Sequence, residues 1–396
     1  DDAMYELGNS YVKANETEKA MRAYNQLNNE YRMSSFVPKA LLRQGLVYYN
    51  EGKNEQALTK FKKIANDYPG TPEAVQSVST ARLIYIDLGR VNQYAACVQT
   101  LDYIEVTDVE LDNATYESAE KQYLDNNVDK AIREFNDYLN EFPNGLYALK
   151  AHFYAAQLYY KKGLTDNASP HYKYVVEATQ SEFSEEALTK LSQIYLENKS
   201  WVQAMPLLKR LEEEASFQHN VIFAQSNLMN ANYQLENYTA AVSYAEKVLS
   251  ISNLENKIKS DAHIIIARSA MKTSDEIKAK AAYQEVEKVA VGEMGAEALY
   301  YKAYFKNKEN KFEESNQSVQ KLAKDFSGYK YYSAKGLVLM AKNFYALNDA
   351  FQSTYILESV IQNFSEFEDV VSEAEEELKK IKQEEAKTNS SIQSED

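Results

Sequence analysis

The sequence contains little glycine and little proline. Its 396 residues include 11 glycines and 6 prolines, less than half the share of roughly 12% that an ordinary globular chain carries. Tight turns between β-strands need these two residues, so the composition argues against most all-β folds. No G-x-G-x-x-G or G-x-x-x-x-G-K-[ST] motif occurs, which leaves no glycine-rich loop for a nucleotide phosphate. The composition therefore predicts a mostly helical protein.

Residues that carry catalysis or bind metals are equally scarce. The single cysteine, Cys97, can form neither an internal disulfide nor a cysteine-based zinc site, and no two of the four histidines lie three or four residues apart. The net charge is −15, whereas nucleic-acid binding needs clustered cations. No run approaches the roughly 18 consecutive apolar residues of a membrane-spanning helix. We expect no enzyme activity, no cofactor, no metal ion, no nucleic-acid partner and no transmembrane segment.

Tyrosine, in contrast, is abundant and regularly spaced. Of the 32 tyrosines, seven recur every 36 to 38 residues: Tyr11, Tyr48, Tyr85, Tyr123, Tyr159, Tyr195 and Tyr233. A column of mostly small residues keeps the same period over ten units: Ala20, Ala57, Tyr94, Ala131, Ala168, Ala204, Ala241, Ala279, Ser315 and Ser353. One period shared by two columns indicates an internal repeat. Apolar residues at helical spacing on both sides of a short break predict two helices per unit, with looser or altered packing where tyrosine or serine replaces alanine.

The residues in these columns resemble the tetratricopeptide repeat. The first unit carries Leu7, Gly8, Tyr11, Ala20, Tyr24 and Leu27, and the second carries Gly45, Tyr48, Ala57, Phe61, Ile64 and Pro69. Residues 131–143 are also similar to repeats of bacterial envelope proteins such as the Tol-Pal coordinating protein and the outer-membrane barrel-assembly lipoprotein. The resemblance implies an all-α fold, an α-α superhelix (a solenoid) of about ten helical hairpins plus a C-terminal capping helix.

The same period divides the chain into segments. We predict a capping helix at 364–383, because its apolar residues lie on one face, and a disordered polar tail at 384–396. The repeats are expected at 1–37, 38–74, 75–111, 112–148, 149–185, 186–221, 222–259, 260–295, 296–333 and 334–363.

In tetratricopeptide proteins the first helices line a concave face that holds a peptide or a partner helix, so the resemblance implies a binding groove. Counting offsets from the tyrosine column predicts these groove residues: Tyr5, Asn9, Leu42, Leu46, Tyr49, Leu83, Ile86, Tyr116, Phe153, Gln157 and Tyr160, followed farther along by Gln193, Ile264, Arg268, Tyr300 and Tyr304. Packing against the neighbouring repeat is the alternative role for each. The carboxylate clamp of cochaperone repeats is not expected, because Tyr5 stands where that clamp needs lysine.

We therefore expect a monomeric, non-catalytic scaffold that binds a protein or peptide. One alternative is a chaperone-like adaptor for outer-membrane assembly, with peripheral association to the envelope; another is a carbohydrate-binding surface protein. Frequent lysine, asparagine and tyrosine are typical of a bacterium with an AT-rich genome, and the envelope-like repeats favour the periplasm or cell envelope over the cytoplasm. The chain enters a helical pattern directly after Asp1, so we expect it to be a segment of a longer precursor.

Overall fold

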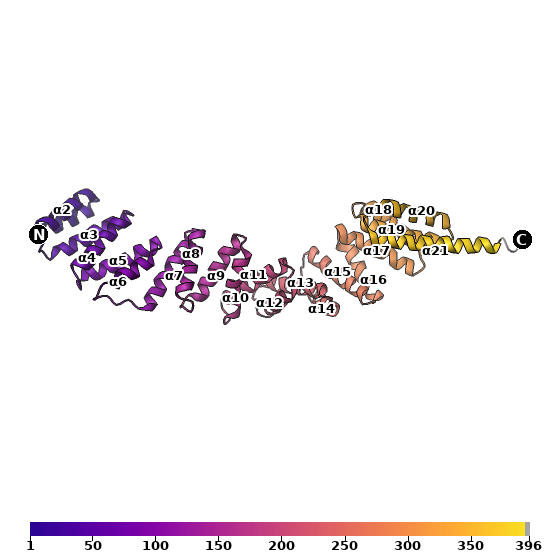
Figure 1. Cartoon of the computed structure of the whole chain (residues 1–396), viewed down its shortest axis with the longest axis horizontal. Helices are drawn as coiled ribbons and strands as arrows, with labels where there is room; N and C mark the ends of the chain where they lie inside the picture. Colours follow the sequence, from indigo (N-terminus) through magenta and orange to yellow (C-terminus); the bar gives the residue numbers. More distant parts are fainter. Residues whose placement is uncertain (393–396) are drawn as a thin grey trace. The chain divides into compact units, whose positions relative to one another are not determined.

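The computed structural model describes residues 1–392, and within them it contains 21 α-helices and no β-strand (Figure 1). The predicted all-α class is confirmed. The chain divides into two compact units, unit 1 (Asp1–Ile194) and unit 2 (Tyr195–Asp396). Each unit is a stack of antiparallel helical hairpins, as the repeat predicts.

Unit 1 contains five hairpins and most of a further helix. Its helices are α1 (Asp2–Lys13), α2 (Thr17–Glu30), α3 (Phe36–Asn50), α4 (Asn54–Asp67), α5 (Pro72–Leu88), α6 (Val91–Val98), α7 (Asp108–Leu124), α8 (Val128–Glu141), α9 (Ala148–Lys161), α10 (Thr165–Glu177) and α11 (Ser184–Glu197). The boundary between the units falls within α11.

Unit 2 contains one helix, four hairpins and a long final helix. Its helices are α12 (Trp201–Glu214), α13 (Gln218–Gln234), α14 (Tyr238–Leu249), α15 (Asn256–Lys272), α16 (Glu276–Val289), α17 (Gly292–Lys308), α18 (Phe312–Asp325), α19 (Lys330–Ala346), α20 (Ala350–Asn363) and α21 (Glu368–Ile392). Helices α1 to α10 thus form five successive pairs in unit 1, and α13 to α20 form four in unit 2.

Every pair has the same turn between its two helices, and the connection between α11 and α12 has it too. One residue, always five positions before the small column, takes a left-handed backbone conformation, with φ between 54° and 73°. Its N–H and that of the next residue bond back to the last turn of the first helix, as Gly52 does to the Tyr49 carbonyl and Lys53 to the Tyr48 carbonyl. This is the glycine-type helix end. The ten residues are Asn15, Gly52, Gly89, Asn126, Gly163, Lys199, Glu236, Ser274, Asn310 and Asn348.

Close approach of the two helices depends on size complementarity between them. A Cβ on Gly8 would lie within 3 Å of the Tyr24 ring, and one on Gly45 would lie equally close to the Phe61 ring. Glycine on the first helix is therefore the recess into which the aromatic ring of the second helix fits. Both rings are almost fully buried.

The small column is buried throughout, and its departures from alanine have local consequences. Ser315 and Ser353 are fully buried, and each hydroxyl donates to a carbonyl of the preceding helix, Ala303 and Ala341 respectively, at 2.8 Å. Packing there is altered by a hydrogen bond rather than loosened. At Tyr94 the second helix, α6, is only 8 residues long, and α5 packs directly against α7.

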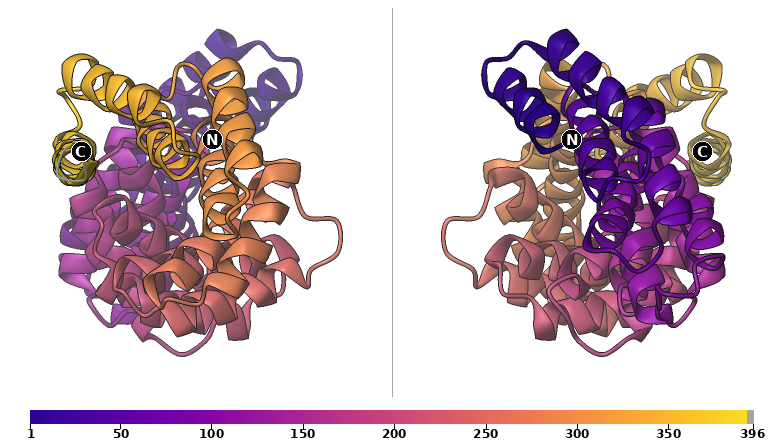
Figure 2. Two further views of the ribbon diagram at one scale, coloured as in Figure 1. Left: turned by 90° about the vertical axis from the view of Figure 1, so that its right-hand side faces the viewer. Right: turned by 90° about the vertical axis from the view of Figure 1, so that its left-hand side faces the viewer.

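The C-terminal helix is longer than the sequence predicts. Helix α21 packs on α19 and α20 and then extends beyond α20, and it is seen end-on in Figure 2. Helical structure reaches Ile392, whereas we predicted a disordered tail from residue 384. The physical reason is that residues 382–387 are mostly good helix formers that continue a helix already anchored by buried Ile381. Residues 393–396 of the predicted tail lie outside the described part of the chain.

Candidate groove in unit 1

A groove of about 590 Å³ runs across the first helices of three successive pairs in unit 1. Helices α7, α9 and α11 supply most of its lining, because first helices of stacked hairpins share one face. Its lining residues are Tyr123, Leu124, Asn126, Gln157, Leu158, Tyr160, Lys161, Tyr172, Glu186 and Lys190. The groove is open along the stack, so it suits an extended ligand better than a small enclosed one.

A chain of hydrogen bonds fixes the polar side chains of the groove. The Tyr123 hydroxyl donates to Gln157 Oε1 at 3.0 Å, and Gln157 Nε2 donates to Glu186 Oε1 at 2.8 Å. The Tyr123 ring stacks on Tyr154 at 4.6 Å between centroids. Burial raises the pKa of Tyr123 above its ordinary value, so the hydroxyl stays a donor at neutral pH. One residue from each of three repeats is thereby held in place.

The apolar part of the groove ends in an exposed leucine. Leu124 is 74% exposed, although it is a large aliphatic residue, while Leu158 and Tyr172 beneath the groove are buried. The Tyr160 ring lies edge-on to the Tyr172 ring. The Lys190 ammonium lies 4.8 Å from the centroid of the Tyr160 ring. An exposed aliphatic side chain beside a tyrosine wall is the kind of surface that gains free energy when a partner covers it.

The predicted groove residues separate into two groups in the structure. Leu42, Ile86, Tyr116 and Phe153 are buried within the helix stack, where they pack against neighbouring helices as the alternative interpretation foresaw. Tyr116 illustrates this, since its ring stacks on Tyr147 at 4.3 Å. Partly or largely exposed surface remains on Tyr5, Asn9, Leu46, Tyr49, Leu83, Gln157 and Tyr160.

Of the partly exposed group, Gln157 and Tyr160 lie together in the groove. Asn9 accepts a hydrogen bond of 2.7 Å from the Tyr24 hydroxyl of its own hairpin, and the Tyr5 ring contacts Phe36. Leu83 is 47% exposed on α5. These positions stay predictions for binding, and the structure gives most of them an additional packing role.

Farther along the chain, one predicted groove residue belongs to a buried ionic cluster of unit 2. Glu297, 2% exposed, accepts hydrogen bonds from Arg268 and from the hydroxyls of Tyr283 and Tyr332, both at 2.8 Å. Burial, together with this carboxylate, raises the pKa of both tyrosines. Arg268 therefore stabilises the packing of α15, α16, α17 and α19. Ile264 and Tyr300 are buried, whereas Gln193 and Tyr304 are partly exposed.

Sequence reasoning missed several side chains that the groove brings together. They are Leu124, Lys161 and Lys190, which lie one residue after, two residues after and five residues before a column tyrosine, respectively. It also missed a contact between His152 and His171, whose Nδ1 atoms lie 2.8 Å apart across the α9–α10 hairpin.

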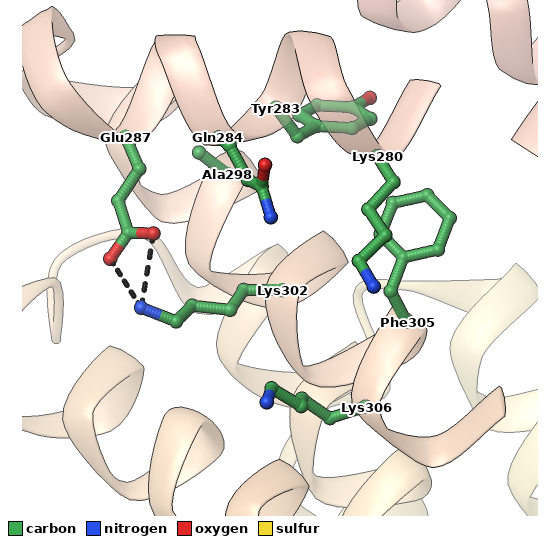
Figure 3. Close-up of a pocket in the computed structure, with 8 residues that line it drawn as sticks. All are labelled: Lys280, Tyr283, Gln284, Glu287, Ala298, Lys302, Phe305 and Lys306. Carbon is green, nitrogen blue, oxygen red and sulfur yellow. Dashed lines mark hydrogen bonds and ion pairs between the residues drawn. The ribbon is translucent and has the colours of Figure 1, made fainter. Parts of the chain in front are cut away.

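A second, smaller hollow of about 130 Å³ lies between α16 and α17 in unit 2 (Figure 3). Tyr283, Ala298 and Phe305 form its apolar side. Its three lysines are all engaged: Lys302 bonds both oxygens of Glu287 at 2.8 and 3.1 Å, Lys280 pairs with Glu309, and Lys306 pairs with Glu314. Its size and paired charges fit a packing defect between helices rather than a groove for a chain.

Within residues 1–392, no group of three or more histidine, cysteine, aspartate or glutamate side chains is arranged to hold a metal ion. Nor does any helix of that range combine the length and apolar character that crossing a bilayer requires.

Comparison with known proteins places the repeat in a family. A model described as a tetratricopeptide repeat-like domain matches residues 95–226, and a tetratricopeptide repeat model matches 2–32 and 39–71. No match was found among curated protein sequences.

Solved structures with similar arrangements share little sequence with this chain. The C-terminal part of a TPR repeat-containing protein from Cytophaga hutchinsonii is similar over 63% of this chain and 95% of its own, with 16% identity and a TM-score of 0.35. Yeast Tom70 is similar over 94% of each chain, with 13% identity and a TM-score of 0.34. PilW, a type IV pilus biogenesis factor, is similar over 67% of this chain and 98% of its own, with 12% identity and a TM-score of 0.30.

The two family models coincide with helix pairs of the structure. The matches at 2–32 and 39–71 fall on α1–α2 and α3–α4, and the match at 95–226 extends from α6 into α13. Together with the turn that recurs in the helical hairpins and the glycine–aromatic fit of α1–α2 and α3–α4, these matches support a protein of the tetratricopeptide repeat family.

Proposed function

We propose that this protein is a non-catalytic scaffold that binds an extended segment of a partner protein in the unit 1 groove. Tetratricopeptide domains generally bind proteins or peptides. The observation that carries the proposal to this groove is Leu124, an aliphatic side chain left 74% exposed at the mouth of a 590 Å³ hollow. Because burying a leucine side chain contributes about 1.5–3 kcal/mol, it is a suitable anchor.

The groove also carries a preorganised polar element. Gln157 is held by Tyr123 on one side and by Glu186 on the other, so little side-chain entropy is lost when a partner docks beside it. A main-chain segment of the partner can use the remaining hydrogen-bonding capacity of the amide and carboxylate. We propose that the protein acts as a monomer and that nucleic acid is not its ligand.

The proposal is tested with a matched pair of exposed leucines. Full-length protein is panned against a random twelve-residue peptide library displayed on phage, and the selected peptides are measured against Leu124→Glu and Leu146→Glu. Leu146 is 69% exposed in the same unit but does not line the groove. We expect affinity to fall at least tenfold in Leu124→Glu and by less than twofold in Leu146→Glu. Equal effects of the two substitutions would refute the groove as the binding site.

We further propose a location in the bacterial cell envelope, supported by the similarity of residues 131–143 to repeats of envelope proteins. An adaptor that holds many outer-membrane clients and a scaffold with one stable partner would use the same groove. They differ in how many proteins can be crosslinked to it, and fractionation of the cells that make the protein tests the location directly.

A further inference from the structure

Two histidines face each other between the helices of the α9–α10 hairpin. His152 lies on α9 and His171 lies on α10, and their Nδ1 atoms are 2.8 Å apart. Both side chains are half-buried. At this distance the two nitrogens share at most one proton, because two N–H donors cannot point at each other. At least one Nδ1 therefore carries a free lone pair, the group with which an imidazole binds a metal ion.

Packing alone does not account for a histidine at both positions. Counted from the small column, the equivalent positions are apolar in the first and last hairpins: Met4 and Ala23, Leu337 and Ile356. Two imidazoles bring four ring nitrogens to this place between the helices, and their mutual contact satisfies only one donor and one acceptor. The pair is therefore a polar feature at a position where other hairpins use apolar contact.

Two tyrosines hold the imidazole rings. The Tyr174 ring stacks on His152 with 3.8 Å between the centroids, and the Tyr159 ring stacks on His171 at 5.7 Å. Tyr159 is itself fixed, because its hydroxyl accepts a hydrogen bond of 2.7 Å from Asn136 Nδ2. Both rings are thus restricted before a ligand arrives, which lowers the entropy that binding costs.

The separation of the two nitrogens fits adjacent ligands of one metal ion. A metal–imidazole bond is about 2.0 Å long, so two nitrogens lie about 2.8 Å apart at a right angle and about 3.3 Å apart at a tetrahedral angle. Right angles between nitrogen ligands are typical of Cu(II) and Ni(II). The ring centroids are 5.0 Å apart, so each ring must turn about its Cβ–Cγ bond to aim its lone pair at the ion. That torsion is broad in histidine.

We propose that His152 and His171 bind one Cu(II) or Ni(II) ion through their Nδ1 atoms, with water in the remaining coordination positions. The ring whose Nδ1 carries the proton takes up its other tautomer, protonated at Nε2, so both rings bind as neutral imidazoles. The ion connects α9 to α10 in the hairpin whose first helix supplies Gln157 and Tyr160 to the groove. The sequence led us to expect no metal ion, because the two histidines are 19 positions apart and no local motif joins them.

The test is a titration of full-length protein, prepared without a polyhistidine tag, with Cu(II) in the presence of glycine as a competing ligand. The variants are His152→Gln and His171→Gln, and the control is His219→Gln, which changes an exposed histidine outside the pair. Circular dichroism checks that each variant keeps its helical content. We expect the affinity for Cu(II) to fall tenfold or more in each of the two variants and by less than twofold in the control.

Electron paramagnetic resonance of the native protein with one equivalent of Cu(II) provides a readout that needs no variant. The spectrum should show coupling of the copper to two imidazole nitrogens, and the coupling should be lost in His152→Gln. Equal affinity in His152→Gln, His171→Gln and His219→Gln would overturn the proposal. A native spectrum without coupling to two nitrogens would overturn it as well, and either result would leave the proposed binding groove untouched.

Discussion

Replacing Glu297 by glutamine should destabilise unit 2 more than any exposed charge substitution. The carboxylate is 2% exposed and accepts from Arg268 at 3.0 and 3.2 Å through Nε and at 2.5 Å through Nη2. It also accepts from two tyrosine hydroxyls at 2.8 Å. Glutamine keeps the volume but turns one acceptor oxygen into a donor that faces other donors.

The magnitude follows from burial. Removing one partner of a buried ion pair costs about 3–5 kcal/mol, because the remaining charge is left uncompensated. The Arg268 side chain is 35% exposed, so water compensates part of its charge and we expect a value near the lower limit, about 3 kcal/mol. The control is Glu246→Gln, which breaks a cross-repeat pair with Lys278 whose side chains are 58% and 40% exposed. Pairs of that kind contribute about 0–1 kcal/mol.

Urea denaturation measures both variants. Trp201, the single tryptophan, lies in α12 of unit 2, so its fluorescence reports that unit, and circular dichroism reports the whole chain. Arg268→Gln combined with Glu297→Gln should cost less than the sum of the single changes, since each removes the charge that the other leaves unpaired. If Glu297→Gln and Glu246→Gln shift the midpoint equally, the reasoning about the buried carboxylate is refuted.

Three further outcomes follow from the packing. Gly45→Ala should cost about 1–3 kcal/mol by overpacking, since its Cβ would lie 2.4 Å from Phe61 Cε1, whereas Gly328→Ala, with nothing within 4 Å, should change the denaturation midpoint little. Gly52→Ala should lower the free energy of unfolding by about 1 kcal/mol through left-handed backbone strain alone, because φ is +70° and the added Cβ would meet nothing. Lys199→Gly, at φ +54°, should raise the free energy of unfolding, since it removes such strain. Burial lowers the pKa of His171, and burial with the neighbouring His171 lowers that of His152 to about 4. The folded state therefore binds fewer protons than the unfolded state, and the α9–α10 hairpin should be fully stable above about pH 6.5 and lose stability as the pH falls toward 4. Hydrogen exchange, corrected for intrinsic rates, should show that residues 148–177 lose protection as the pH falls, relative to residues 36–67, which contain no histidine. Equal loss in both segments would contradict this prediction. The same loss in a His152→Gln, His171→Gln protein would contradict it too.

The repeat columns made the fold predictable because each column residue has one packing role in every unit. Ala57 and Phe61 fix the distance between the helices of a pair, and their spacing of four residues is visible in the sequence. The hairpin turn was predictable where glycine occupies it, as at Gly52, and not at Lys199 or Glu236, which take the same left-handed conformation although neither is glycine. The C-terminal extension of α21 was missed because polar residues with good helix propensity resemble a disordered tail.

The groove was harder to predict for a geometric reason. An offset counted along one helix does not tell whether a side chain points to the groove or to the neighbouring repeat, since successive residues rotate by about 100°. Gln157 and Tyr160 line the hollow of unit 1, whereas Tyr116 and Phe153 are buried.

The central claim, that the unit 1 groove binds a partner protein, is tested most directly by photocrosslinking in the cells that make the protein. A benzophenone amino acid is placed at position 124 or, as the control, at position 146. We predict ultraviolet-dependent adducts from position 124 that are absent from position 146, with one discrete partner for a scaffold and many for a chaperone-like adaptor. Adducts of equal yield from both positions, or none from position 124, would contradict the account.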